Sequence, residues 1–236
     1  MGIVKENTVA EVVSKNLGSD HIFSKYKIDF CCGGGMTLEA VCKEKDIAFE
    51  VLKHEIESVN DKINGTDSLT DHDLGSLMQM AQNEYHQTIN NSFELTMPLA
   101  SKVADVHGDS HIEVVAINEH LKRIRAYINR TIASTLDSFF PAIDDILRLD
   151  HPRAEITMKQ IETLKGAIET LSSEKRPIVD LFNKISDLSS NYTAPEDACN
   201  SYRFLYQSLQ QLDNEVHKYL HFEKHILKPK ALKIIA

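Results

Sequence analysis

The sequence predicts an all-α protein, with a small N-terminal helical domain followed by an antiparallel four-helix bundle. After residue 70 the chain carries four long amphipathic segments, whose apolar residues recur every three or four positions, separated by short breaks. The strict alternation of apolar and polar residues that marks a half-buried strand does not occur. A chain of 236 residues that is 42% hydrophobic is long enough for two such domains.

The N-terminal domain opens with a helix start signal. Thr8 and Glu11 have the spacing of a capping box, in which each side chain bonds the backbone N–H of the other residue, and Gly18 favours the end of that helix. Apolar spacing and turn residues predict three further helices, at about 21–26, 37–44 and 46–63. Polar residues around Asn64-Gly65 then predict the domain organisation, namely 1–60, a linker at 61–70, and 71–236.

The bundle segments are expected at about 70–106, 111–149, 153–190, and from 200 to the C-terminal region. Proline lacks a backbone N–H and clashes with the preceding turn of a helix. We therefore expect Pro98, Pro141 and Pro177 to bend or interrupt the first three segments.

Charge and cysteine content exclude several classes of protein. The formal net charge is −9 and Lys and Arg are not clustered, which argues against binding to nucleic acid or to an anionic membrane. The first residues lack the apolar core of a signal peptide, and no run approaches the ~18 apolar residues of a membrane span. The four cysteines form neither a disulfide framework nor paired CxxC motifs, so we expect a protein of the reducing cytoplasm.

The feature with the clearest chemical content is Cys31-Cys32, followed by three glycines and then by a helix start at Thr37. Adjacent cysteines rarely form a disulfide with each other, and a helix N-terminus favours the thiolate. The pair is therefore a candidate reactive or ligand-binding element, although a loop that merely holds two small, half-buried residues accounts for the spacing equally well. The pair has no histidine base nearby in sequence, so no conventional catalytic constellation is identified.

Four stretches together carry a family resemblance: 8–13, 22–34 with its Phe30-Cys31-Cys32-Gly33 core, 37–42 and 47–52. They resemble the N-terminal domain of the ScdA/YtfE family of bacterial iron-sulfur cluster repair proteins. In that family the domain precedes a hemerythrin-like four-helix bundle with a non-haem di-iron centre, and the proteins protect or repair iron-sulfur centres damaged by nitric oxide or oxidants. The resemblance implies the same fold here and a reactive role for Cys31 and Cys32.

The resemblance also implies which residues hold the iron, and this chain has only part of that set. His86 and Glu223 carry over as candidate metal ligands. The four other ligand positions fall on Thr131, Thr135, Tyr219 and either Ile161, which the apolar period favours, or Glu162. A neutral hydroxyl does not replace imidazole or carboxylate at such a centre, so we expect a depleted di-iron site.

Histidines elsewhere do not restore the set. His217, His221 and His225 share one helix face, which lies roughly 160° from the apolar stripe, so we expect all three to point to solvent. His107 and His111 flank a turn and are not convincing replacements.

Two functions follow from the resemblance. The first is an iron-sulfur cluster repair protein of nitrosative and oxidative stress, acting on damaged iron-sulfur proteins, with the cysteine pair as its reactive element. The alternative is a metal-free, degenerate paralogue that regulates or pairs with an intact family member. A homodimer through the N-terminal domain is compatible with both.

Overall fold

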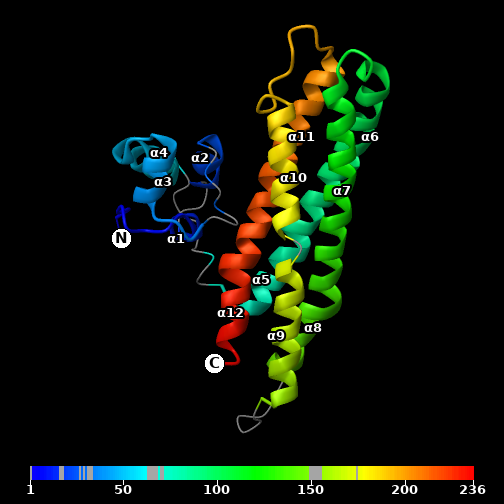
Figure 1. Ribbon diagram of the computed structural model, residues 1–236. Helices are drawn as coiled ribbons and strands as arrows, with labels where there is room; N and C mark the ends of the chain where they lie inside the picture. Colours follow the sequence, from blue (N-terminus) through cyan, green and yellow to red (C-terminus); the bar gives the residue numbers. More distant parts are fainter. Residues whose placement is uncertain are drawn as a thin grey trace. The chain divides into compact units, whose positions relative to one another are not determined.

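A computed structural model describes residues 2–15, 19–26, 28, 30, 34–62, 69, 72–148, 156–173 and 175–236 (Figure 1). Every regular element among these residues is helical, and their single β pairing is an isolated bridge between Thr8 and Thr37. The all-α prediction is confirmed. No helix in this part of the chain is both long and apolar enough to cross a membrane.

The described residues divide into two compact units, Met1–Ala81 with His217–Lys233, and Gln82–Val216 with Ile234–Ala236. The last long helix, α11 (Asn200–Phe222), therefore contributes residues to both units. The predicted linker falls mostly outside the described residues, so the predicted boundary there stays a prediction.

The first unit contains the short helices α1 (Val9–Lys15), α2 (Ser19–Lys25), α3 (Leu38–Lys45), α4 (Phe49–Lys62) and α5 (Leu74–Met80), and the C-terminal segments η3 (Glu223–Leu227) and α12 (Lys228–Lys233). The expected capping box is present, because the backbone N–H of Thr8 donates to Glu11 at 3.0 Å and that of Glu11 donates to Thr8 Oγ1 at 3.2 Å. Phe23, Leu38, Leu52 and Ile56 are fully buried in its core. Local capping and a small apolar core thus account for this fold.

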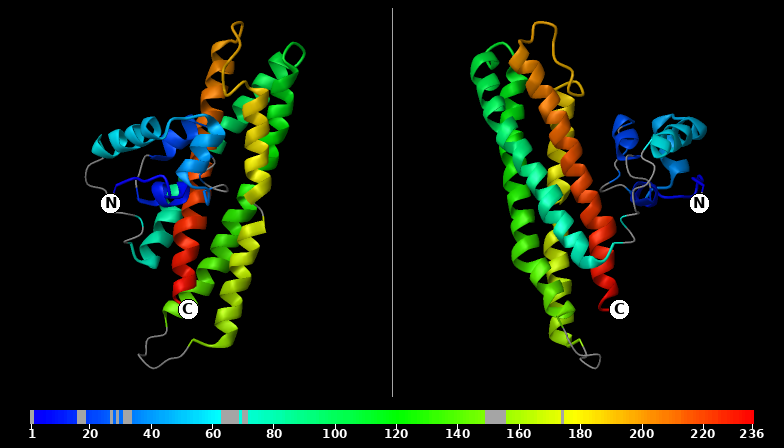
Figure 2. Two further views of the ribbon diagram at one scale, coloured as in Figure 1. Left: turned by 60° about the vertical axis from the view of Figure 1, so that its left-hand side comes forward. Right: turned by 180° about the vertical axis from the view of Figure 1, so that it is seen from behind.

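The second unit is the helical bundle. It contains α6 (Gln87–His107), α7 (Ile112–Ser134), α8 (Phe140–Leu147), α9 (Met158–Ser173), α10 (Lys175–Leu188) and α11 as far as Val216. A short turn joins α6 to α7 and a longer loop, residues 189–199, joins α10 to α11, and these four helices run side by side (Figure 2). The apolar stripe predicted from the sequence forms the core, with Ile89, Leu121, Ile124, Ile128, Phe182 and Leu209 almost completely buried.

The three prolines lie in different settings. Pro177 lies in the first turn of α10, where a missing N–H costs no helical hydrogen bond. Pro141 does not interrupt its helix as expected, because the helical run continues from α7 through the π-helical residues Thr135–Phe139 into α8. Pro98 likewise lies inside α6, which continues through it. Pro98 and Glu94, the residue one turn earlier, are both exposed, so water can bond the carbonyl that the proline leaves free.

Candidate functional site

Cys31 and Cys32 lie outside the described residues, but the residues on either side of the loop are described. Phe30 is buried, and its carbonyl accepts a hydrogen bond from Nδ1 of His221 at 2.9 Å. Since a carbonyl can only accept, Nδ1 carries a proton. On the other side, a Cβ on Gly34 would lie 2.7 Å from the Phe30 carbonyl oxygen and 3.3 Å from Nε2 of His225. Only glycine fits there, because any side chain would collide with the backbone.

In the histidine row on the last helix, His221 is buried and His217 and His225 are half-buried, so the expectation that all three point to solvent is wrong. His221 is 3% exposed, with Nε2 3.3 Å from the hydroxyl of Ser14, and its ring centroid lies 5.9 Å from that of Phe30. The rings of His221 and His225 lie 4.9 Å apart. Within the first unit, this helix face packs against the N-terminal residues. A periodicity argument that assumes one buried stripe cannot detect such a second packing partner.

The sequence did hold a signal for this second buried face. Phe222 lies off the predicted stripe and is almost completely buried. A helix that is apolar on more than one face is typically buried on more than one face.

The iron-ligand positions on the second bundle helix do not fit a metal centre. Thr131 is 2% exposed and Thr135 is fully buried. Their hydroxyls donate to backbone carbonyls one turn earlier, from Thr131 to Tyr127 at 3.1 Å and from Thr135 to Thr131 at 2.8 Å. Both are neutral groups bonded within their own helix, so neither supplies the charge that a metal pair requires.

The remaining positions in the second unit give a mixed result. His86 is 4% exposed and thus buried, as a ligand would be. On α9, Glu162 is exposed and Ile161 is half-buried. The exposed Glu162 is not placed as a core ligand, and Ile161 has no ligating atom.

Glu223, the other candidate ligand, belongs to the first unit and pairs with a buried lysine. Glu223 is fully buried, Lys228 is 6% exposed, and Lys228 Nζ lies 3.2 Å from Glu223 Oε1. The two residues are brought together by η3, a π-helical segment in which the Lys228 N–H bonds the Glu223 carbonyl five residues earlier. The ammonium supplies positive charge to this carboxylate, so a metal ion would have to compete with it.

Three π-helical segments coincide with the candidate ligand positions. His86 ends η1 (Ala81–His86), Thr135 begins η2 (Thr135–Phe139), and Glu223 begins η3. Such segments recur at functional sites because they carry one extra residue in the helix. The described residues nevertheless contain no group of three or more His, Cys, Asp or Glu side chains arranged to hold a metal ion. Among the described residues, those at the ligand positions thus do not fit a di-iron centre.

Comparison with known proteins accounts for both parts of the chain. Residues 5–60 match the ScdA_N family, which is described as a domain of unknown function (DUF542). The iron-sulfur cluster repair protein ScdA of Staphylococcus haemolyticus is 30% identical over 95% of this chain and 97% of its own length. ScdA of Staphylococcus epidermidis is 28% identical over 97% of this chain and 99% of its own. The iron-sulfur cluster repair protein YtfE of Yersinia pseudotuberculosis is 22% identical over 90% of each chain. The chain therefore belongs to the ScdA/YtfE family of iron-sulfur cluster repair proteins.

Proposed function

We propose that this protein repairs or protects damaged iron-sulfur centres in the cytoplasm, with Cys31 and Cys32 as its reactive element. The observation that carries the proposal is the 30% identity with Staphylococcus haemolyticus ScdA over 95% of the chain, a relative whose name states that function. Such similarity over the whole length favours the repair function over that of a degenerate paralogue.

The described flanks of the cysteine loop support a role for the thiols. Phe30 is buried and bonded to His221, and Gly34 has no room for a side chain, so both ends of the loop are fixed. Neighbouring thiolates are suitable ligands for iron and acceptors for sulfur or nitric oxide adducts.

We further propose that the cysteine pair, rather than a resident di-iron centre, handles iron in this chain. Family membership makes iron the metal concerned. His86 and Glu223 stay as candidate ligands, but the self-bonded hydroxyls of Thr131 and Thr135 and the pairing of Glu223 with Lys228 argue against a tight centre.

A repair function implies that the partners of this protein are damaged iron-sulfur proteins. Two assemblies are proposed in addition. One is a homodimer formed through residues 1–60, and the other is a complex with an intact family member. Light scattering of the protein alone, and mixed with such a member, distinguishes them.

The experiment is complementation of a bacterial strain that lacks its own repair protein. After nitric oxide treatment, recovery of a [4Fe–4S] dehydratase is followed in cells that express the wild type, Cys31→Ser with Cys32→Ser, or Cys42→Ala as the matched control. Cys42 is buried in the core of the first unit, and burial raises the pKa of its thiol even though Lys5 opposes this, so it is an unreactive cysteine.

We expect recovery with the wild type and the Cys42 variant, and none with the double variant. Full recovery with the double variant, at equal expression, would remove the cysteine proposal and leave the repair function standing. Failure of the wild type itself would count against the repair function.

A further inference from the structure

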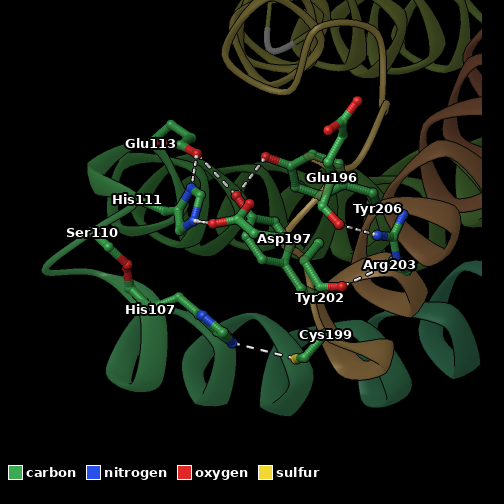
Figure 3. Close-up of polar contacts among 11 residues, drawn as sticks. His107, Ser110, His111, Glu113, Glu196, Asp197, Cys199, Tyr202, Arg203 and Tyr206 are labelled. Atoms are coloured by element: carbon green, nitrogen blue, oxygen red, sulfur yellow. Dashed lines mark hydrogen bonds and ion pairs between the residues drawn. The ribbon is translucent and has the colours of Figure 1, made fainter.

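A second cysteine site lies in the bundle unit, where the α6–α7 turn meets the start of α11 (Figure 3). His107 is the last residue of α6, and Cys199 directly precedes α11. His107 Nε2 lies 3.3 Å from Cys199 Sγ, and Cys199 is exposed. A thiol within hydrogen-bond reach of an imidazole has the arrangement of a nucleophile and its base.

Both partners are held in place by neighbouring groups. The ring of His107 packs against that of Tyr202, with centroids 5.4 Å apart. On the other side, Arg203 donates to two carbonyls of the loop that leads to Cys199, that of Ala198 at 3.1 Å and that of Glu196 at 2.7 Å. Because these contacts already order both groups, little conformational entropy is lost when the imidazole approaches the thiol.

The neighbouring His111 cannot act as the base, because carboxylates take both its ring nitrogens. Nδ1 lies 3.2 Å from Glu113 and Nε2 lies 3.2 Å from Asp197 (Figure 3). Glu113 is held in turn by the hydroxyl of Tyr202 at 2.9 Å. His107 is thus the imidazole of this cluster whose nitrogen faces the sulfur.

We propose that Cys199 and His107 form a thiol-exchange site for small-molecule disulfides. His107 Nε2 takes the thiol proton, and the Cys199 sulfur attacks one sulfur of the disulfide. A bond between the two sulfurs forms as the disulfide bond breaks, and the leaving thiolate recovers the proton from His107. Cys199 is oxidised to a mixed disulfide and the leaving sulfur is reduced to a thiol.

The surroundings of Cys199 favour thiol exchange over metal binding and over an internal disulfide with Cys42. The described residues hold no group of three metal-ligating side chains, so a metal site at Cys199 is not supported. Among the described cysteines the other, Cys42, is buried, so it does not offer an exposed thiol for an internal disulfide. Because Cys199 is exposed, a small-molecule disulfide can reach its sulfur from solution.

The test uses the reduced full-length protein and bis(2-hydroxyethyl) disulfide, a neutral probe. Peptide mass spectrometry follows the mixed disulfide at Cys199 and at Cys42 from pH 5 to 9. His107→Gln removes the base, and His120→Gln, on α7 and without contact to the sulfur, is the matched control. The same rates measured for the wild type in urea give the reactivity of the unfolded thiol.

We expect Cys199 to react about tenfold faster in the folded than in the unfolded wild type near pH 7. His107→Gln should abolish this advantage and change the pH profile, whereas His120→Gln should keep both, with Cys42 slow throughout. Equal folded and unfolded rates in the wild type, or an unchanged rate and profile in a folded His107→Gln variant, would overturn the proposal.

Discussion

Two carboxylates of this protein, Glu223 and Glu113, are each paired with a cation in very different surroundings. Glu223 is fully buried beside Lys228, itself 6% exposed, in the first unit. Glu113 belongs to the bundle unit, where its side chain is 29% exposed and that of its partner His111 is 17% exposed. The nitrogen–oxygen distance is 3.2 Å in both pairs, and the Glu223 pair is much the more deeply buried.

That difference determines what each pair can do. In a low-dielectric interior, loss of one partner leaves a charge that water cannot stabilise. The folded state therefore depends on keeping both partners of the Glu223 pair. Near the surface, water stabilises either partner and the pair adds little to stability. The Glu113 pair can therefore respond to pH without unfolding the protein.

The largest effect is expected when the buried pair is broken. Lys228→Met removes the ammonium beside Glu223 and should lower the free energy of unfolding by about 3 kcal/mol. Urea denaturation measures this. The matched control is Lys122→Met, whose pair with Glu119 is exposed and should matter by less than ~1 kcal/mol. Glu223→Leu combined with Lys228→Met should recover most of the loss, and a double variant no more stable than the single one would contradict this account.

The next prediction concerns iron. If Lys228 supplies the charge at Glu223, protein purified anaerobically without a histidine tag should contain far less iron than a di-iron centre requires, and His86→Ala should not change this content. Elemental analysis measures it. A stoichiometric iron pair that His86→Ala removes would show that a working centre forms despite the two threonines.

The smallest effect is the pH response of the exposed pair. Burial lowers the pKa of His111, but the hydrogen bonds that its ring N–H groups donate to Asp197 and Glu113 outweigh this and raise that pKa above its ordinary value. Its contribution to stability is therefore complete below an ordinary histidine pKa of ~6.5 and is lost as the pH rises through the raised value. For Glu113, burial is outweighed by bonds from its own backbone N–H, Tyr202 and His111, which lower the pKa. Its contribution is lost only as the pH falls through that lowered value.

A melting-temperature series from pH 4 to 9 checks this for the wild type and His111→Gln. The difference between them should be largest near pH 5 to 6 and shrink above pH 7. A difference that grows towards pH 9 would mean that His111 is neutral in the folded protein.

Much of the fold could be predicted from the sequence because it rests on local signals. The capping box at Thr8 and the start of α10 near Pro177 depend on residues a few positions apart, and the bundle core follows the apolar period. The sequence also shows that threonines, Thr131 and Thr135, stand at two of the ligand positions that the family resemblance implies.

What could not be predicted depends on contacts between distant residues. The burial of His221 requires Ser14 and Phe30, about two hundred positions away, and the pairing of His107 with Cys199 requires two helix ends to meet. The Glu223–Lys228 pair was missed for another reason. Five positions apart on an ideal α-helix, these side chains point in different directions, and only the π-helical turn aligns them.

The three π-helical segments also bear on how this chain should be aligned with its relatives. Each segment holds one residue more than a regular α-helix of the same length, which is equivalent to a single-residue insertion. A relative whose helices are regular at these places would need one-residue gaps there, and an ungapped alignment would rotate every later residue by about 100°. Deleting one residue between Glu223 and Lys228 would leave the two side chains four positions apart on a regular α-helix, where they still share one face, so the ion pair should survive the loss of the π-helical turn.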